Sequence, residues 1–174
     1  VCDNERLSSV EAYTGTGWTP LPPMPHATYH ATACVLNGRL HVIGGGGMHS
    51  NRLQVLEMTE ENGLSWSCKA DLPARRYGAA SCVHEGKIWV MGGFAGGPTA
   101  SVISYDAEAD AWSTGPPLPD ACWGCKAATN DSASGIPLVH SSHGCFQYTG
   151  AAWSVVTEPP GAAQVPVCGS VLLG

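Results

Sequence analysis

Two cysteines and two histidines in the second half of the chain stand at spacings that suit redox or metal chemistry. Cys122 and Cys125 form a C-x2-C motif, and His140 and His143 follow with two residues between them. A C-x2-C pair is typical of redox dithiols, but its low thiol pKa usually depends on a helix N-terminus, and no helix is predicted here. With the histidines the pair forms C-x2-C-x14-H-x2-H, near zinc-site spacing, and Cys145 lies just beyond.

We favour free thiols and solvated loop histidines over a metal at these positions, because zinc-like spacing outside its usual fold is weak evidence. Cys34 and Cys82 stand at equivalent places in apolar segments and are expected to be small buried hydrophobes. A disulfide between them is not expected, because equivalent atoms of neighbouring repeats lie beyond bridging distance. Reduced thiols favour an intracellular location, in the cytosol or an organelle. No cofactor is expected.

Catalytic motifs are sparse in this sequence. It has no G-x-S-x-G nucleophile motif and no phosphate-binding loop. Gly44-Gly-Gly-Gly47 follows a predicted strand but opens no helix, so it is not expected to cradle a phosphate. The acidic segment around Asp106, Glu108 and Asp110 predicts a solvated turn, because a calcium loop also needs a Gly and a terminal Glu that are missing. These observations predict a protein that is not an enzyme.

Composition limits the class of protein further. The 174 residues carry a net charge of −6 with only 8 Lys and Arg, which argues against nucleic acid as a partner. Apolar residues make up 44% and charged residues 13%, so the chain can bury a core, yet no apolar run reaches the length of a membrane span. The 22 Gly and 13 Pro favour short strands joined by tight turns over helices.

One segment of the sequence occurs twice. Asn37-Gly-Arg-Leu-His-Val-Ile-Gly-Gly45 matches Glu85-Gly-Lys-Ile-Trp-Val-Met-Gly-Gly93, 48 residues further along. A Trp recurs at similar intervals, and most of its copies precede a Leu-Pro pair. The repeated tryptophans are Trp18, Trp66, Trp112 and Trp153. A period of this length is typical of propeller blades.

A Gly doublet after an alternating strand, followed by Tyr, Trp and Leu-Pro, resembles the kelch family over nearly the whole chain. Each kelch repeat forms one four-stranded blade, so the resemblance implies an all-β, kelch-type β-propeller. The doublets Gly44-Gly45 and Gly92-Gly93 are then expected where the second strand of a blade passes close to its neighbours, which favours residues without Cβ. The repeated Trp are expected to fill gaps between the outer strands of adjacent blades.

The chain is expected to form a single propeller domain, 1–174, with three complete blades and a half blade at each end. The boundaries are a half blade at 1–22, blades at 23–70, 71–116 and 117–157, and a half blade at 158–174. The predicted strands are 9–13 and one at Trp18; 31–36, 39–44, 52–58 and 64–68; 78–83, 87–92, 100–106 and 111–113; 125–129, 136–139, 144–148 and 152–155; and 165–168 and 171–173.

The two half blades allow two architectures. Either they complete one blade and close a four-blade ring, or the chain is part of a ring of about five to seven blades. We favour the part of a larger ring, because kelch rings usually exceed four blades. The blade at 117–157 is degenerate: His140-Ser141 replace the Gly doublet, and Pro137 falls inside its second strand, which is expected to be short, bulged or at an edge.

With strands a to d in chain order, the resemblance places the d–a and b–c loops on one face, where the family usually binds partners. Arg and aromatic side chains dominate the hot spots of protein interfaces. The predicted partner-binding residues are Tyr29, Tyr77, Trp123, Arg75, Arg76, His26, Met48 and Phe94. The alternative is that the aromatics only pack the blade entrances and that Arg76 pairs with a carboxylate or a backbone carbonyl.

The predicted function is a non-catalytic protein-interaction module, scaffold or accessory subunit, with other protein chains of a larger assembly as its partners. Fold does not fix function, so two alternatives stay open. One is an enzyme on a kelch-like propeller, of the oxidase, isomerase or product-specifying type. The other is a substrate adaptor of a ubiquitin ligase, which needs a recruiting domain outside these residues.

Overall fold

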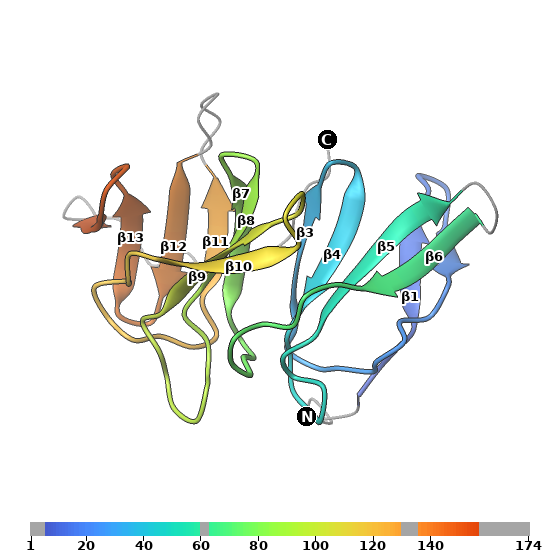
Figure 1. The fold of residues 1–174 in the computed structure, drawn as a ribbon, viewed down its shortest axis with the longest axis horizontal. Helices are drawn as coiled ribbons and strands as arrows, with labels where there is room; N and C mark the ends of the chain where they lie inside the picture. The colour runs from blue at the N-terminus through green and yellow to red at the C-terminus, as the bar shows by residue number, and fades with distance from the viewer. Residues whose placement is uncertain (1–5, 60–62, 130–135, 157–174) are drawn as a thin grey trace.

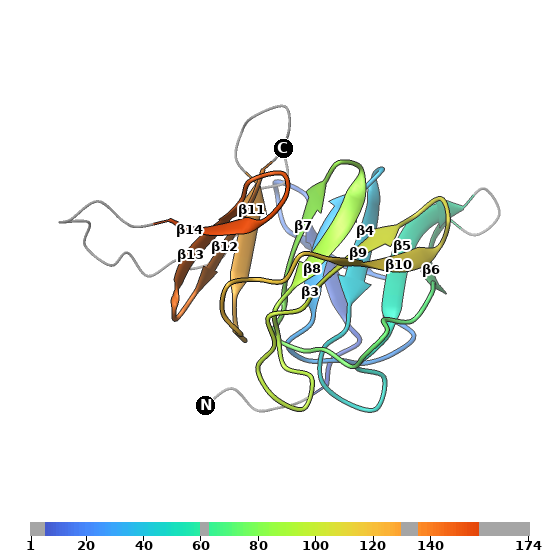
Figure 2. The same cartoon turned by 60° about the vertical axis from the view of Figure 1, so that its left-hand side comes forward.

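The structure, a computed structural model, describes residues 6–59, 63–129 and 136–156 as a series of antiparallel β-sheets. A two-stranded N-terminal hairpin is followed by three four-stranded sheets, here called blades two, three and four, arranged in an open arc (Figure 1; Figure 2). Strands lie in chain order across each blade, and the first strands of neighbouring blades pack against one another. Among the described residues no helix is long and apolar enough to cross a membrane.

The strand bounds follow the chain blade by blade. The hairpin consists of β1 (Val10–Tyr13) and β2 (Trp18–Leu21). Blade two consists of β3 (Thr32–Leu36), β4 (Arg39–Ile43), β5 (Leu53–Thr59) and β6 (Gly63–Cys68). Blade three consists of β7 (Ala80–His84), β8 (Lys87–Met91), β9 (Val102–Asp106) and β10 (Ala111–Gly115). Blade four consists of β11 (Lys126–Thr129), β12 (Pro137–Ser141), β13 (Gly144–Tyr148) and β14 (Trp153–Val156).

These strands confirm the predicted fold class. Every strand predicted within the described residues is present close to its predicted bounds, including all four strands of the degenerate blade. The described strands form part of a propeller and do not close into a ring. The half blade predicted at 158–174 lies outside the described residues.

The prediction for the strand that contains Pro137 is wrong. β12 has five residues, lies between β11 and β13, and keeps a continuous register with both, so it is neither short, bulged nor at an edge. Pro137 stands at its first position, opposite Thr129, and the ladder to β13 begins one residue later at Leu138. A proline is tolerated at the first residue of a strand, so the ladder survives.

Side-chain alternation builds one core in each gap between blades. In β8, Ile88 and Val90 join the core shared with blade two, whereas Trp89 and Met91 join the core shared with blade four. Full burial of such side chains contributes about 1.5–3 kcal/mol each. Since each core needs two blades, a single blade has no stable core of its own.

The first Gly doublet ends β4 where the chain passes closest to blade three. Gly44 and Gly45 have φ values of 64° and 95°, a region that side chains with Cβ rarely adopt. A Cβ on Gly44 would overlap the backbone oxygen of Arg76, and the amide of Gly45 donates to that same oxygen at 2.8 Å. The doublet therefore serves as a docking point for the chain that enters the next blade.

The second doublet repeats this arrangement between blades three and four. The amide of Gly93 donates to the backbone oxygen of Cys122 at 2.7 Å. A Cβ on Gly92 would lie 2.6 Å from Sγ of Cys122 and 2.8 Å from Sγ of Cys125. The backbone contact is thus the same in both gaps, although different side chains surround it.

Three of the repeated tryptophans bridge the outer strands of adjacent blades. Each indole Nε1 donates to a carbonyl of the linker that leads into its own blade. The pairs are Trp66 with Pro22 at 2.6 Å, Trp112 with Ala70 at 2.9 Å, and Trp153 with Pro116 at 3.0 Å. The ring buries apolar surface while its one donor is satisfied, which suits Trp at this position.

Trp18 departs from this pattern. Its side chain is 69% exposed, and that of its ring neighbour Tyr13 is 61% exposed, whereas Tyr105, the equivalent of Tyr13 in blade three, is 1% exposed. Within the described residues no blade covers this side of the hairpin, so the expected burial of Trp18 between blades is not observed.

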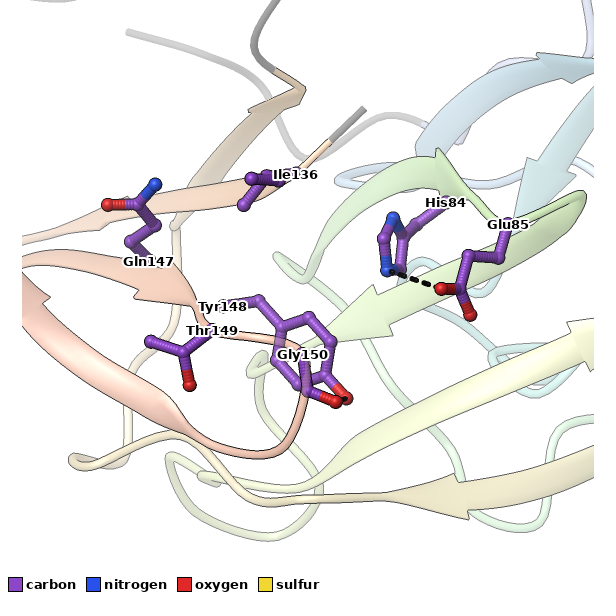
Figure 3. A pocket seen from close by; sticks show the side chains of 7 residues that line it. All are labelled: His84, Glu85, Ile136, Gln147, Tyr148, Thr149 and Gly150. Carbon is purple, nitrogen blue, oxygen red and sulfur yellow. Dashed lines mark hydrogen bonds and ion pairs between the residues drawn. The ribbon is translucent and has the colours of Figure 1, made fainter. Parts of the chain in front are cut away.

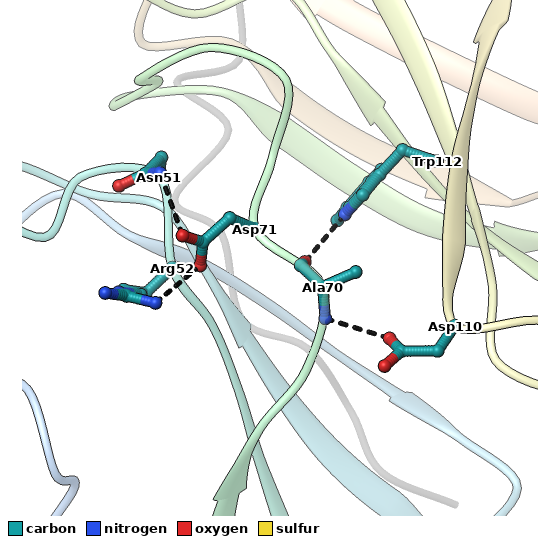
Figure 4. Close-up of polar contacts among 6 residues, drawn as sticks. All are labelled: Asn51, Arg52, Ala70, Asp71, Asp110 and Trp112. Carbon is teal, nitrogen blue, oxygen red and sulfur yellow. Dashed lines mark hydrogen bonds and ion pairs between the residues drawn. The ribbon is translucent and has the colours of Figure 1, made fainter.

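The linker between blades two and three is held from both sides (Figure 4). On the blade-two side, Asp71 accepts hydrogen bonds from Asn51 at 3.2 Å and from Arg52 at 2.9 Å. On the blade-three side, the amide of Ala70 donates to Asp110 at 2.9 Å. Asp110 is therefore more than a solvated turn residue, because it fixes the path of the linker.

Gly44→Ala is expected to lower the free energy of unfolding by about 3 kcal/mol or more, because the new Cβ meets a backbone oxygen that cannot move aside. Urea unfolding followed by tryptophan fluorescence measures the loss. Gly38→Ala is the matched control: its φ is 72° and its added Cβ meets nothing within 4 Å, so it carries only a backbone cost of about 1 kcal/mol. Equal losses in the two variants would contradict the close approach.

Candidate protein-binding face

Each complete blade begins with a four-residue d–a turn, at 28–31, 76–79 or 122–125. The third residue of each turn is left-handed, with φ of 50° at His30, 59° at Gly78 and 66° at Gly124. The turns are also hydrogen-bonded in series, since the amide of Gly78 donates to the His30 oxygen at 2.9 Å and that of Gly124 to the Gly78 oxygen at 2.7 Å. The residues at the second position are Tyr29, Tyr77 and Trp123.

The two tyrosines are packed in place by the b–c loops. The ring of Tyr77 stacks on Phe94 with centroids 5.1 Å apart and an interplanar angle of 27°. Their backbones also bond, because the amide of Phe94 donates to the Tyr77 oxygen at 2.8 Å. Tyr29 lies on Gly46, where any added Cβ would overlap its ring. Both tyrosines are half-buried, so part of each ring is structural.

Trp123 and Met48 are large apolar side chains that this face exposes. Trp123 is 57% exposed and Met48 is 72% exposed. The loop from β4 to β5, which carries Met48, and the loop from β8 to β9 project on the same side of the arc (Figure 1). We call this side, defined by Tyr29, Met48, Tyr77, Phe94 and Trp123, the loop face.

His26 lies beside His49, with ring centroids 4.1 Å apart. Partial burial is the first cause that lowers the pKa of His26, and the nearby His49 and Arg52 lower it further. This shift favours the neutral imidazole, which suits ring packing next to the loop face. His49 was not predicted as a site residue, because the repeat has no equivalent histidine that would signal the pair.

The two adjacent arginines have different environments. Arg75 is exposed, as expected for a partner-binding residue. Arg76 is only 4% exposed and lies inside the fold, so its place among the partner-binding residues is corrected. Its Nη1 donates to the carbonyl oxygens of Gly92 at 2.9 Å and Ser101 at 2.8 Å, and its Nη2 donates to Ser101 Oγ at 3.0 Å. Arg76 therefore donates to backbone carbonyls at the end of strand b and at the start of strand c, so it pairs with backbone carbonyls, as one of the two alternatives for this residue predicted.

Burial disfavours the charged form of the Arg76 guanidinium. Desolvation lowers its pKa, and the Cys125 thiolate opposes that shift. Its Nε has no hydrogen-bond partner among the described residues. Nothing in the sequence signalled the partner Ser101, because neither the repeat nor a motif includes it.

The four residues at zinc-like spacing, for which no metal was favoured, are not brought together. Cys122 and Cys125 are 1% and 2% exposed, with their Sγ atoms 2.8 Å apart. His140 is exposed on β12, directly opposite Lys126, and His143 is exposed in the following turn. In the part of the chain that the structure describes, no three His, Cys, Asp or Glu side chains are grouped so as to hold a metal ion.

A small pocket opens on the opposite face, between blades three and four (Figure 3). Its volume is about 340 Å³, and it is lined by the a–b turn of blade three, by Ile136 before β12, and by the end of β13 with the c–d turn of blade four. His84 lies edge-on to Tyr148 there, and its Nε2 is 3.9 Å from the Glu85 carboxylate. The pocket is separate from the loop face, because a–b and c–d turns lie at the other end of the strands.

Comparison with known proteins supports the fold. Residues 75–119, which span blade three, match the family model described as "Kelch motif". The solved structure of YjhT is similar to this chain with a TM-score of 0.65 at 16% sequence identity, over 81% of this chain and 54% of that one. The chain therefore spans about half the length of YjhT, and the likeness shows the fold alone. The sequence matches no curated protein.

The described sheets are therefore part of a kelch-type β-propeller, as the repeat predicted. The kelch motif itself is found in blade three, the blade that keeps the Gly doublet, the Tyr and the Trp together.

Arg76→Met is expected to lower the free energy of unfolding by about 3 kcal/mol, because it leaves the Gly92 carbonyl without its donor and removes one of the two donors to the Ser101 carbonyl. Chemical unfolding measures the change. The neighbouring Arg75→Met serves as the control and is expected to change stability by less than about 0.5 kcal/mol. A similar loss in both variants would show that Arg76 does not hold strand b.

Proposed function

We propose that this chain is part of a non-catalytic protein-interaction module that binds another protein chain through the loop face. The observation on which the proposal rests is the exposure of Trp123 and Met48 above packed d–a turns and b–c loops. Exposed apolar and aromatic side chains that share one face are typical of protein-interaction sites. Kelch motifs generally mediate protein interactions, which supports the same conclusion.

The chemistry of the loop face suits binding. Aromatic rings, a thioether and the exposed guanidinium of Arg75 bury much surface and supply directional contacts, which is the composition of interface hot spots. The stacking of Tyr77 on Phe94 and the contact of Tyr29 with Gly46 hold the rings before a partner arrives. Such pre-organisation reduces the entropy lost on binding.

We further propose that the chain acts as a scaffold or accessory subunit within a larger assembly. Tyr13 and Trp18 of the hairpin expose their aromatic rings. The tryptophans at the equivalent positions of blades three and four, Trp112 and Trp153, instead pack against a neighbouring blade. Coverage of this aromatic pair by further protein would remove an apolar surface that otherwise favours aggregation. That surface is separate from the loop face, so assembly and partner binding use different parts of the chain.

Trp123→Ala combined with Tyr77→Ala is expected to weaken partner binding at least tenfold, since aromatic hot spots contribute about 2 kcal/mol or more each. Affinity purification with the full chain identifies proteins retained by the native sequence, and titration of the purified partner gives the dissociation constant. Val155→Ala is the matched control, because Val155 is 56% exposed on the outer strand of blade four, away from the loop face. Partners that bind the loop-face variant and the control equally would contradict the proposal.

A further inference from the structure

We propose that Cys122 and Cys125 are a redox-active dithiol that closes into an intramolecular disulfide on reaction with a peroxide. Their Sγ atoms are 2.8 Å apart at the two ends of one d–a turn. A disulfide needs about 2.05 Å between sulfurs, so closure requires only a small movement of two side chains. The dithiol chemistry does not depend on whether the loop face binds a protein.

The propeller repeat supplies the turn that brings the two thiols together. All three d–a turns share the left-handed third residue that folds a four-residue segment back on itself. The first and fourth residues of the turn are Thr28 and Ala31 in blade two and Arg76 and Ala79 in blade three. Only blade four has cysteines at both places, so the fold sets the geometry and this blade alone adds the reactive groups.

The packing around the pair matches two sulfur atoms. Gly92 leaves room for both, since a Cβ there would lie within 2.8 Å of each Sγ. Both thiols belong to the core between blades three and four, yet Trp123 and Gly124 between them are exposed. A small oxidant therefore needs only a local opening of the turn to reach the sulfurs.

The environment distinguishes Cys125 as the nucleophile. The pKa of Cys125 is lowered to about 7, chiefly by a hydrogen bond from the Cys122 thiol; burial opposes this shift, and backbone hydrogen bonds add to it. The pKa of Cys122 is raised because its proton is held in that bond. By contrast, burial raises the pKa of Cys34 and of Cys82 to about 12, so those thiols stay protonated and unreactive. The helix that usually activates a C-x2-C motif is thus replaced by a thiol donor and by backbone amides.

The reaction proceeds in two balanced steps. The Cys125 thiolate attacks one oxygen of hydrogen peroxide, the O–O bond breaks, and the sulfenic acid forms while the hydroxide released takes up a proton to become water. The Cys122 sulfur then attacks the Cys125 sulfur, the S–O bond breaks, and the hydroxyl leaves as a second water with the Cys122 proton. Two thiols are oxidised to one disulfide and one peroxide is reduced to two waters.

The test treats the reduced full chain with hydrogen peroxide at pH 7, blocks the remaining thiols with an alkylating reagent and maps the peptides by mass spectrometry. The expected result is a peptide in which Cys122 and Cys125 have together lost two hydrogen atoms and take no alkyl group, restored by a reducing agent. The proposal is overturned if this peptide stays fully alkylated while the exposed Cys68 is oxidised. It is also overturned if Cys125 pairs with another cysteine or goes to the sulfinic acid without a disulfide.

Two variants separate reactivity from folding, because each has the shape of a side chain that another blade has at the same place. Cys122→Val has the shape of Thr28 but no hydrogen-bond donor, so the turn is expected to fold, and at pH 7 the alkylation of Cys125 is expected to slow on the order of tenfold as its pKa returns toward about 8.5. Cys125→Ala copies Ala79 and is expected to lose the disulfide entirely. Unchanged alkylation of Cys125 in Cys122→Val would show that the two thiols do not act as a pair.

Discussion

The hydrogen bond between a Gly doublet and the next d–a turn is the contact on which the rest of the structure depends. Gly45 bonds the Arg76 oxygen and Gly93 bonds the Cys122 oxygen, and both contacts need a backbone without Cβ. They fix how far apart neighbouring blades sit. At that separation the alternating strands close the two interblade cores, and the Trp side chains reach the linker carbonyls at the outer edge. Each further contact between blades follows from this spacing.

The d–a turn has the same backbone conformation in each blade, but its side chains differ. The same turn therefore contributes to the structure in three different ways. The first residue can bond carbonyls from inside, as Arg76 does, or supply a thiol, as Cys122 does. The second residue is an aromatic that the turn presents to the loop face, where Trp123 is the most exposed example. The proposed recognition and the proposed thiol chemistry therefore use neighbouring residues of one four-residue segment, in which Trp123 is exposed and the two cysteines are buried.

Much of the fold could be predicted from the sequence because the determining features are local and repeated. The doublet Gly44-Gly45 and its copy 48 residues later fix the position of strand b, and the alternating segments around them fix the other strands. Pro137 misled the prediction, because the position of a proline within a strand decides its effect, and a shift of one residue places it at a tolerated first position.

The candidate site could be predicted only in part, because burial depends on neighbours that are distant in sequence. Arg75 and Arg76 look alike in the sequence, and only the carbonyls of Gly92 and Ser101 distinguish them. The zinc hypothesis rested on the spacing of four residues along the chain. In the structure, strand pairing places His140 opposite Lys126 on β12, where the His140 side chain is exposed and the two thiols are buried. Spacing alone does not show on which face of a strand a ligand lies.

Amide hydrogen exchange at Gly45 and Gly93 tests the central contact most directly. Both amides lie at the ends of strands, beside loops, where exchange is ordinarily fast. If the docking bonds hold the blades together, these two amides exchange as slowly as those of the central strand β8, and their protection is lost only when the blades separate. Exchange at the rate of an open loop, with β8 still protected, would contradict this role of the glycine contact, because the blades would then be held by their cores without it.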